Sequence, residues 1–252
     1  MSPVGRFEGK VVMVTGSSSG IGEATARRFA DEGAAVVVNS ATSVEAGEQV
    51  AAGLRERGAD ATYVQADVAD GDQRARLVDE AVRVHGRLDV LVNNAGTTKV
   101  IPHADLDAAT EEVFRRILDV NLIGTFELTK LALPHLRATG SGAVVNVTSI
   151  AGIRPTGSSI PYAVSKAALN HLTDLLANVT GPEVRVNAVA PGLIRTPWTA
   201  DWGPIHDLMA ERAPLGRSGE PDDVAAAIVD IAANPYLTGQ VVVVDGGLSL
   251  RG

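Results

Sequence analysis

Short apolar runs alternate along the chain with longer segments whose apolar residues recur at helical spacing. The short runs are mostly unbroken series of Val, Leu and Ala, which is typical of parallel strands covered on both faces. The predicted strands are Lys10–Thr15, Ala35–Asn39, Ala61–Gln65, Leu88–Val92, Ala143–Val147, Val184–Val189 and Gln240–Val244. The predicted helices are Ile21–Glu32, Glu45–Arg57, Gln73–His85, Thr110–Arg137, Tyr162–Ala177 and Asp222–Ala233.

The repeated order of strand, helix and strand continues without a break in composition. It predicts the α/β class and one domain over residues 1–252, a Rossmann-type doubly wound parallel sheet of about seven strands with helices on both faces. The one long stretch without a strand, 191–239, contains Pro, Trp and helix signals. Such a segment is typical of a cover over a site, and we expect a substrate lid near 193–215.

Composition narrows the classes of partner. The chain has 252 residues, 45% of them hydrophobic, and 22 Lys and Arg against 30 Asp and Glu give a net charge of −8. We therefore expect neither nucleic acid nor a membrane surface as a partner. With no cysteine and five scattered histidines, neither a disulfide nor a metal site is expected. The N-terminal residues lack the apolar core of a signal peptide, so a cytoplasmic location is expected.

A glycine-rich turn follows the first predicted strand and opens the first predicted helix. Gly16 lets the chain turn tightly, Gly20 removes a Cβ where backbone would approach a pyrophosphate, and Gly22 permits close helix–strand packing. The pattern predicts a dinucleotide site. Two alternatives remain: an ordinary turn, or the G-x-S-x-G elbow of serine hydrolases, which would leave Gly22 without a role.

Tyr162 and Lys166 open a predicted helix one turn apart, so their side chains share a face. A tyrosine with its usual pKa of about 10 is a poor base at neutral pH. An ammonium about 4 Å away attracts the phenolate by roughly 4 kcal/mol at an effective dielectric of about 20, so we expect Lys166 to lower the pKa of Tyr162. Ser149, after the fifth predicted strand, could hold a substrate oxygen beside the phenol. Taken singly, these residues could also be a surface pair and a capping serine.

Taken together and in this order, these features resemble the short-chain dehydrogenase/reductase family over almost the whole chain. The resemblance is carried by Thr15-Gly16-(x)3-Gly20-Ile21-Gly22, Asp67-Val68, Asn93-Asn94-Ala95-Gly96, Asn121, Ser149, Tyr162-(x)3-Lys166, and Pro191-Gly192 followed by Thr196. It implies the strand order 3-2-1-4-5-6-7. It also implies hydride transfer between a nicotinamide cofactor and a ketone or secondary alcohol, chemistry that belongs to the cofactor while the protein supplies position and charge.

The resemblance implies four catalytic residues. Tyr162 would exchange a proton with the substrate oxygen, and Lys166 would lower its pKa and contact the nicotinamide ribose. Ser149 would orient the carbonyl or alcohol. Asn121 would hold a water in a relay from Lys166 to solvent.

The cofactor contacts are also implied by the resemblance. Asp67 would bind the adenine amino group, residues 94–96 would line the adenine ribose, and Ile194 and Thr196 would meet the nicotinamide carboxamide. With the second strand included, the expected contacts are Gly16, Ser18, Ser19, Gly20, Ile21, Gly22, Asn39, Ser40, Asp67, Val68, Asn94, Ala95, Gly96, Tyr162, Lys166, Pro191, Gly192, Ile194 and Thr196.

The end of the second strand favours NADP(H). NAD selection normally uses a carboxylate there, and no acid occurs between Glu32 and Glu45. Four polar residues could instead donate to a 2′-phosphate: Asn39, Ser40, Thr42 and Ser43. No Arg or Lys lies among them, and Ser19 stands where many NADP-linked members carry a basic residue, so NAD(H) remains the alternative.

The substrate is expected to be a small carbonyl or alcohol compound. Trp198 and Trp202 would share a face if helical, and could form one wall of an apolar pocket, pack the lid or contact a subunit. A 3-oxoacyl reductase acting on a carrier protein or CoA is the second candidate. It is disfavoured because Lys166 is the only Lys or Arg between Ala163 and Val184. The non-enzymatic alternative is an NADP-binding regulatory protein.

Family resemblance implies a homo-oligomer, often a tetramer. The predicted helices Thr110–Arg137 and Tyr162–Ala177 are the expected contact elements, and the C-terminal segment Asp245–Leu250 could join another interface.

Overall fold

The computed structural model describes residues 5–251. The first four residues and Gly252 of the expected domain lie outside the described residues. Those first four residues also belong to the N-terminal segment that is expected to lack a signal peptide. Its centre is one parallel sheet in the order β3-β2-β1-β4-β5-β6-β7, as predicted. The strands are β1 (Val11–Val14), β2 (Ala35–Ser40), β3 (Ala61–Gln65), β4 (Val90–Asn93), β5 (Gly142–Val147), β6 (Val184–Pro191) and β7 (Val241–Val244).

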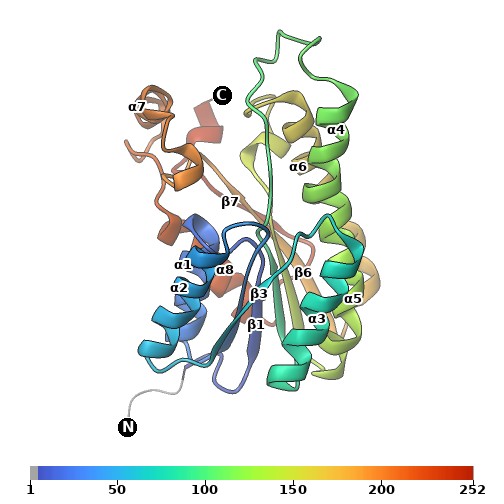
Figure 1. Ribbon diagram of the computed structural model, residues 1–252. Coiled ribbons are helices and arrows are strands. Elements are labelled where there is room, and N and C mark those ends of the chain that lie inside the picture. Colours follow the sequence, from blue (N-terminus) through green and yellow to red (C-terminus); the bar gives the residue numbers. More distant parts are fainter. Residues whose placement is uncertain (1–4, 252) are drawn as a thin grey trace.

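Helices cover both faces of the sheet (Figure 1). One face carries α1 (Gly20–Asp31), α2 (Val44–Glu56) and α8 (Pro221–Ala233). The other carries α3 (Gly71–His85), α5 (Thr125–Ala138) and α6 (Ile160–Thr180). The remaining helices are α4 (Glu111–Leu118) and α7 (Gly203–Arg212), with short helical turns at η1 (Asp119–Gly124), η2 (Ile150–Gly152), η3 (Pro197–Thr199) and η4 (Leu248–Arg251).

Side-chain alternation along the strands builds a separate core on each face. In β1, Val12 and Val14 join the cluster under α1, α2 and α8, whereas Val11 and Met13 join the cluster under α3, α5 and α6. All four side chains are buried. This is why the strand sequences are continuously apolar, and the predicted fold class is confirmed.

The predicted single helix Thr110–Arg137 needs a correction. The helical stretch is α4, then the π-helical turn η1, then α5. Gly124 ends this wider turn and packs closely against Val68: an added Cβ would lie 2.5 Å from the carbonyl oxygen of Val68. A π turn inside an α-helix often marks a functional site, and this one carries Asn121.

The fold brings the carboxyl ends of β1, β2, β4, β5 and β6 to one edge of the sheet. The strands β2 and β3 lie on one side of β1, and β4 to β7 lie on the other, so the strand order reverses between β1 and β4. Open α/β sheets bind ligands at the carboxyl edge beside such a reversal. Within residues 5–251, none of the helices combines the length and apolar character needed to cross a bilayer.

Candidate active site

A cavity of about 1410 Å³ follows the carboxyl edge of the sheet. It runs from the end of β2, at residues 39–43, past the glycine turn to Ser149, Tyr162 and the two tryptophans. The volume exceeds that of an ordinary ligand pocket of roughly 300–1,000 Å³, so it can hold an extended dinucleotide together with a substrate.

The glycine turn is shaped for close approach of another group. Gly16 and Gly20 have φ of +61° and +57°, in the left-handed region that favours glycine. A Cβ on Gly22 would lie 2.4 Å from the carbonyl oxygen of Gly16 and 2.5 Å from Nδ2 of Asn94. Ser19, the N-cap of α1, makes no side-chain cap, so the first N–H groups of α1 are left to a ligand. The cradle therefore fits the pyrophosphate of a dinucleotide.

Polar side chains brace this turn from behind, a function that the sequence did not predict. The Asn94 amide donates to the carbonyl oxygens of Thr15 and Gly16, both at 2.9 Å. The Ser17 hydroxyl donates to Val14 O at 2.7 Å and accepts from the N–H of Asn39 at 3.0 Å. The turn is thus held in its ligand-ready shape by the chain itself.

The end of β2 differs from the prediction of free donors. Asn39 is 1% exposed, and its amide donates to the carbonyl oxygens of Val64 and Ala66, both at 3.0 Å. Its two amide protons are therefore used, and the expectation that this side chain donates to a 2′-phosphate is wrong. The Ser40 hydroxyl pairs with that of Tyr63 at 2.8 Å. Both residues still line the cavity.

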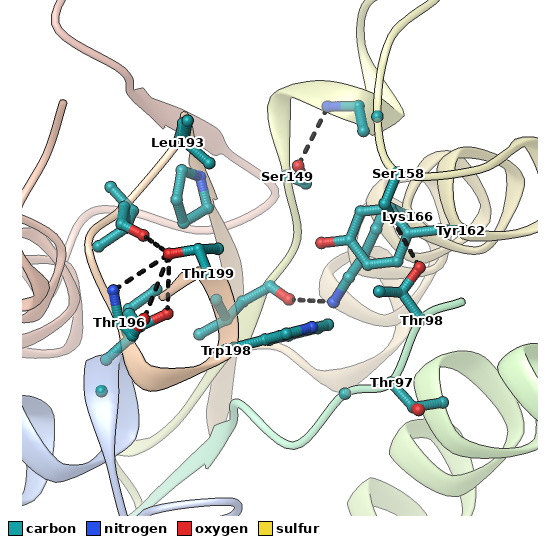
Figure 2. A pocket seen from close by; sticks show the side chains of 18 of the residues that line it. Thr97, Thr98, Ser149, Ser158, Tyr162, Lys166, Leu193, Thr196, Trp198 and Thr199 are labelled. Atoms are coloured by element: carbon teal, nitrogen blue, oxygen red, sulfur yellow. Dashed lines mark hydrogen bonds between the residues drawn. The ribbon is translucent and has the colours of Figure 1, made fainter. Parts of the chain in front are cut away.

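Tyr162 lies in the first turn of α6, and its side chain faces the cavity beside Ser149 and Trp198 (Figure 2). The Ser159 hydroxyl caps the helix by accepting from the N–H of Tyr162 at 3.4 Å. Desolvation by burial raises the pKa of Tyr162 to about 12, while a hydrogen bond with Ser149 opposes the rise. The phenol is therefore a neutral proton donor at pH 7.

Lys166 lies one turn further along α6 and is 3% exposed. Its Nζ donates to the carbonyl oxygen of Val147 at 2.8 Å and lies 5.7 Å from the centroid of the Tyr162 ring. Burial lowers the pKa of Lys166 to about 8. The expected fall in the pKa of Tyr162 is therefore absent from the protein by itself: desolvation of the phenol raises the pKa, and Ser149, not Lys166, opposes the rise.

Asn121, on the π turn, is fully buried. Its Oδ1 accepts from the N–H of Thr97 at 2.8 Å, and its Nδ2 donates to Thr97 O and to Ser165 Oγ, both at 3.0 Å. A Cβ on Gly96 would lie 3.5 Å from Asn121 Oδ1 and 3.7 Å from Lys166 Nζ, so the two side chains converge there. The Asn121 side chain thus fixes the loop after β4 against α6. The water relay implied by family resemblance stays a prediction.

The other expected cofactor residues border the same cavity. The Asp67 carboxylate accepts from the N–H of Ala69 at 2.9 Å and pairs with Arg116 at 3.3 Å. The Thr196 methyl covers the glycine turn, because a Cβ on Gly20 would lie 3.1 Å from it. The cavity lining includes all the predicted cofactor residues except Gly22, which packs behind the turn: Gly16, Ser18, Ser19, Gly20, Ile21, Asn39, Ser40, Asp67, Val68, Asn94, Ala95, Gly96, Tyr162, Lys166, Pro191, Gly192, Ile194 and Thr196.

The two tryptophans line the cavity but do not share one helix face. Trp198 lies in η3 and meets the Tyr162 ring edge-to-face, with centroids 6.3 Å apart. Trp202 is the N-cap of α7. Among residues 5–251, no group of three or more His, Asp or Glu is arranged to hold a metal ion.

Comparison with known proteins decides the family. The family profile described as enoyl-(acyl carrier protein) reductase matches residues 16–249. A protein named as ketoacyl reductase 2 of the granaticin polyketide synthase of Streptomyces violaceoruber is 58% identical over 246 residues, 96% of this chain and 97% of that one. This chain belongs to the short-chain dehydrogenase/reductase family.

Other members of the family agree in sequence and in fold. The 3-oxoacyl-(acyl-carrier-protein) reductase of Thermotoga maritima is 40% identical, over 96% of this chain and 99% of its own length. The crystal structure of a protein assigned to the family from Burkholderia xenovorans has a TM-score of 0.90 and 42% identity, covering 96% of this chain and 98% of that one. The protein is therefore an oxidoreductase acting on CH–OH groups, and the family implies a nicotinamide cofactor.

Proposed function

We propose that this short-chain dehydrogenase/reductase reduces a ketone to a secondary alcohol with Tyr162 as the acid. The placement of the Tyr162 phenol in the cavity, beside Ser149 and one turn from Lys166, carries the proposal. When bound, the reduced nicotinamide supplies a hydride to the carbonyl carbon. Tyr162 gives its proton to the carbonyl oxygen, and Ser149 holds that oxygen in place. The buried Lys166 ammonium then stabilises the tyrosinate that remains.

The test is a screen of NADPH and NADH oxidation over ketones, quinones, sugars and acyl thioesters. Turnover of any carbonyl compound, lost on Tyr162→Phe, would support the proposal. Cofactor binding without turnover across the panel would contradict it.

NADP(H) is the cofactor that the end of β2 favours. The cavity reaches residues 39–43 without meeting an acidic side chain there. Asn39 cannot donate to a 2′-phosphate, but the exposed Thr42 and Ser43 lie on the cavity lining and their hydroxyls can. Comparing kcat/KM for the two cofactors checks the choice, and a preference for NADH would refute it. Ala41→Asp, which places a carboxylate on the cavity lining, should shift the ratio at least tenfold toward NADH.

A second candidate substrate, a 3-oxoacyl thioester, is favoured by three arginines that sequence reasoning did not consider. Arg154, Arg212 and Arg251 line the cavity and are exposed. Within the described residues, none of them forms an ion pair. An unneutralised basic rim on a protein of charge −8 suits an anionic carrier, and the relative from the granaticin synthase is named as a ketoacyl reductase. Arg154→Ala and Arg212→Ala should raise KM for carrier-bound acetoacetyl thioester while leaving KM for a neutral ketone unchanged.

We also propose that the protein is a homo-oligomer. Large apolar side chains are exposed on the expected contact helices: Ile123, Phe126 and Leu131 on η1 and α5, and Val164, Leu175 and Val179 on α6. Exposed apolar side chains on the elements expected to meet another subunit favour an interface there. Light scattering should give the mass of a tetramer, and a mass near 26.1 kDa would contradict the proposal.

A further inference from the structure

His206 on α7 is a buried histidine to which the mechanism gives no role. It is 3% exposed, and both ring nitrogens have hydrogen-bond partners. Nδ1 lies 2.9 Å from the hydroxyl of Ser218, and Nε2 lies 3.1 Å from the hydroxyl of Thr199. These partners belong to segments on either side of α7 in the chain.

The available protons decide how His206 is bonded. The Thr199 hydroxyl has one proton, and its shortest contact is with the carbonyl oxygen of Ile194, at 2.7 Å. It also accepts from the N–H of Thr196 at 3.2 Å, so Nε2 of His206 must be a donor to it. Nδ1 pairs with the Ser218 hydroxyl, which also lies 3.3 Å from the backbone carbonyl oxygen of His206. Both ring nitrogens are therefore engaged, one toward each end of the link.

This network joins the lid to the loop that borders the nicotinamide end of the cavity. Figure 2 shows the Thr199 hydroxyl bonded to Thr196, and the same hydroxyl donates to the carbonyl oxygen of Ile194. The same loop is held from its other side by Gly219, whose N–H donates to Leu193 O at 3.0 Å. Ile205 and Met209, on the helix that carries His206, line the cavity. The loop and the lid helix thus share one buried polar link.

We propose that His206 is a positioning residue that couples the lid helix α7 to the loop 194–199, so that the nicotinamide end of the site is shaped before the cofactor arrives. The identity of the ligand rests on the proposed function, whereas the mechanical link rests on the hydrogen bonds alone. Breaking the link should loosen the loop and α7 together and weaken cofactor binding, since binding must then order both segments.

Two substitutions separate the two ends of the link. In His206→Gln the side-chain amide can take the position of Nε2 and reach Thr199. In His206→Asn the shorter side chain places its amide only at the position of Nδ1, toward Ser218. His85→Asn is a matched control: the His85 side chain is 2% exposed and bonded through both nitrogens, to Thr62 and Asp60, at the end of α3 and outside this cavity.

Calorimetry with NADPH and hydrogen exchange of the cofactor-free protein are the two measurements. His206→Asn should raise Kd about tenfold, which corresponds to roughly 1.4 kcal/mol or one hydrogen bond, and should speed amide exchange over 194–212. The Kd of His206→Gln should stay within about threefold of wild type, and His85→Asn should lower Tm without changing Kd or amide exchange over 194–212.

Equal Kd values for His206→Asn and His206→Gln, or unchanged exchange in His206→Asn, would overturn the inference. A wild-type protein that binds neither NADPH nor NADH would refute the proposed function, and the exchange result would still decide the link.

Discussion

The buried ammonium of Lys166 should cost the protein stability, and replacing it should recover that stability. Burial lowers the pKa of Lys166 from 10.5 to about 8, a difference that corresponds to about 3 kcal/mol at 1.36 kcal/mol per pKa unit. Lys166→Met removes this cost but leaves the carbonyl oxygen of Val147 without its donor, a loss of about 1 kcal/mol. We therefore expect the inactive variant to be more stable than wild type by about 2 kcal/mol at pH 7.

The lowered pKa of Lys166 also sets how the folding stability changes with pH. Between pH 8 and pH 10.5 the unfolded chain binds more protons at Lys166 than the folded protein does, so wild-type stability rises with pH across this window. The advantage of Lys166→Met should shrink over the same range and reverse near its upper end. Below pH 8 both states are protonated, and the difference should be constant.

Urea unfolding at a fixed protein concentration, from pH 7 to pH 10, measures both effects. Lys99→Met, which removes an exposed lysine, is the control and should change neither the stability nor its pH dependence. A Lys166→Met protein that is less stable than wild type at pH 7, or a stability difference that does not change with pH, would refute the reasoning.

Two further substitutions test the shape of the site. Gly22→Ala should raise the Kd for NADPH, measured by calorimetry, more than tenfold, because the added methyl group would lie 2.4 Å from the carbonyl oxygen of Gly16. Gly53→Ala is the control, since nothing lies within 4 Å of its added methyl group, and its affinity should be unchanged. Equal effects of the two substitutions would contradict this account. Trp198→Ala should raise KM for ring-bearing ketones several-fold more than for small aliphatic ketones, because Trp198 packs on Tyr162. Steady-state kinetics measure this difference. Equal changes in KM for the two classes of ketone would assign the side chain to lid packing instead.

Most of the sheet could be predicted from the sequence because its signals are local. Continuous apolar runs gave each strand within a few residues, and the turn at Gly16 and Gly20 has the left-handed φ that its glycines favour. The π turn at Asp119–Gly124 was missed because one extra residue in a helical turn leaves the apolar pattern almost unchanged. Gly124 lies in this turn against Val68, a contact that involves a residue distant in sequence.

The uses of polar side chains were harder to predict, because they depend on residues distant in sequence. Asn39 was expected to face a phosphate, but its amide protons are used by carbonyl groups at the end of β3. The link through His206 requires Thr199 and Ser218 together, and no spacing in the sequence indicates it. The pKa of Tyr162 depends on burial, which the i, i+4 spacing from Lys166 does not contain.

The proton donor is tested most directly by turnover and cofactor affinity measured together in Tyr162→Phe. We predict that kcat/KM for a ketone that wild type reduces falls by about 10²–10⁴-fold, while the Kd for NADPH stays within about threefold. Tyr236→Phe, at a tyrosine that is 99% exposed, should match wild type in both. Near-normal turnover in Tyr162→Phe with bound cofactor would show that another group supplies the proton.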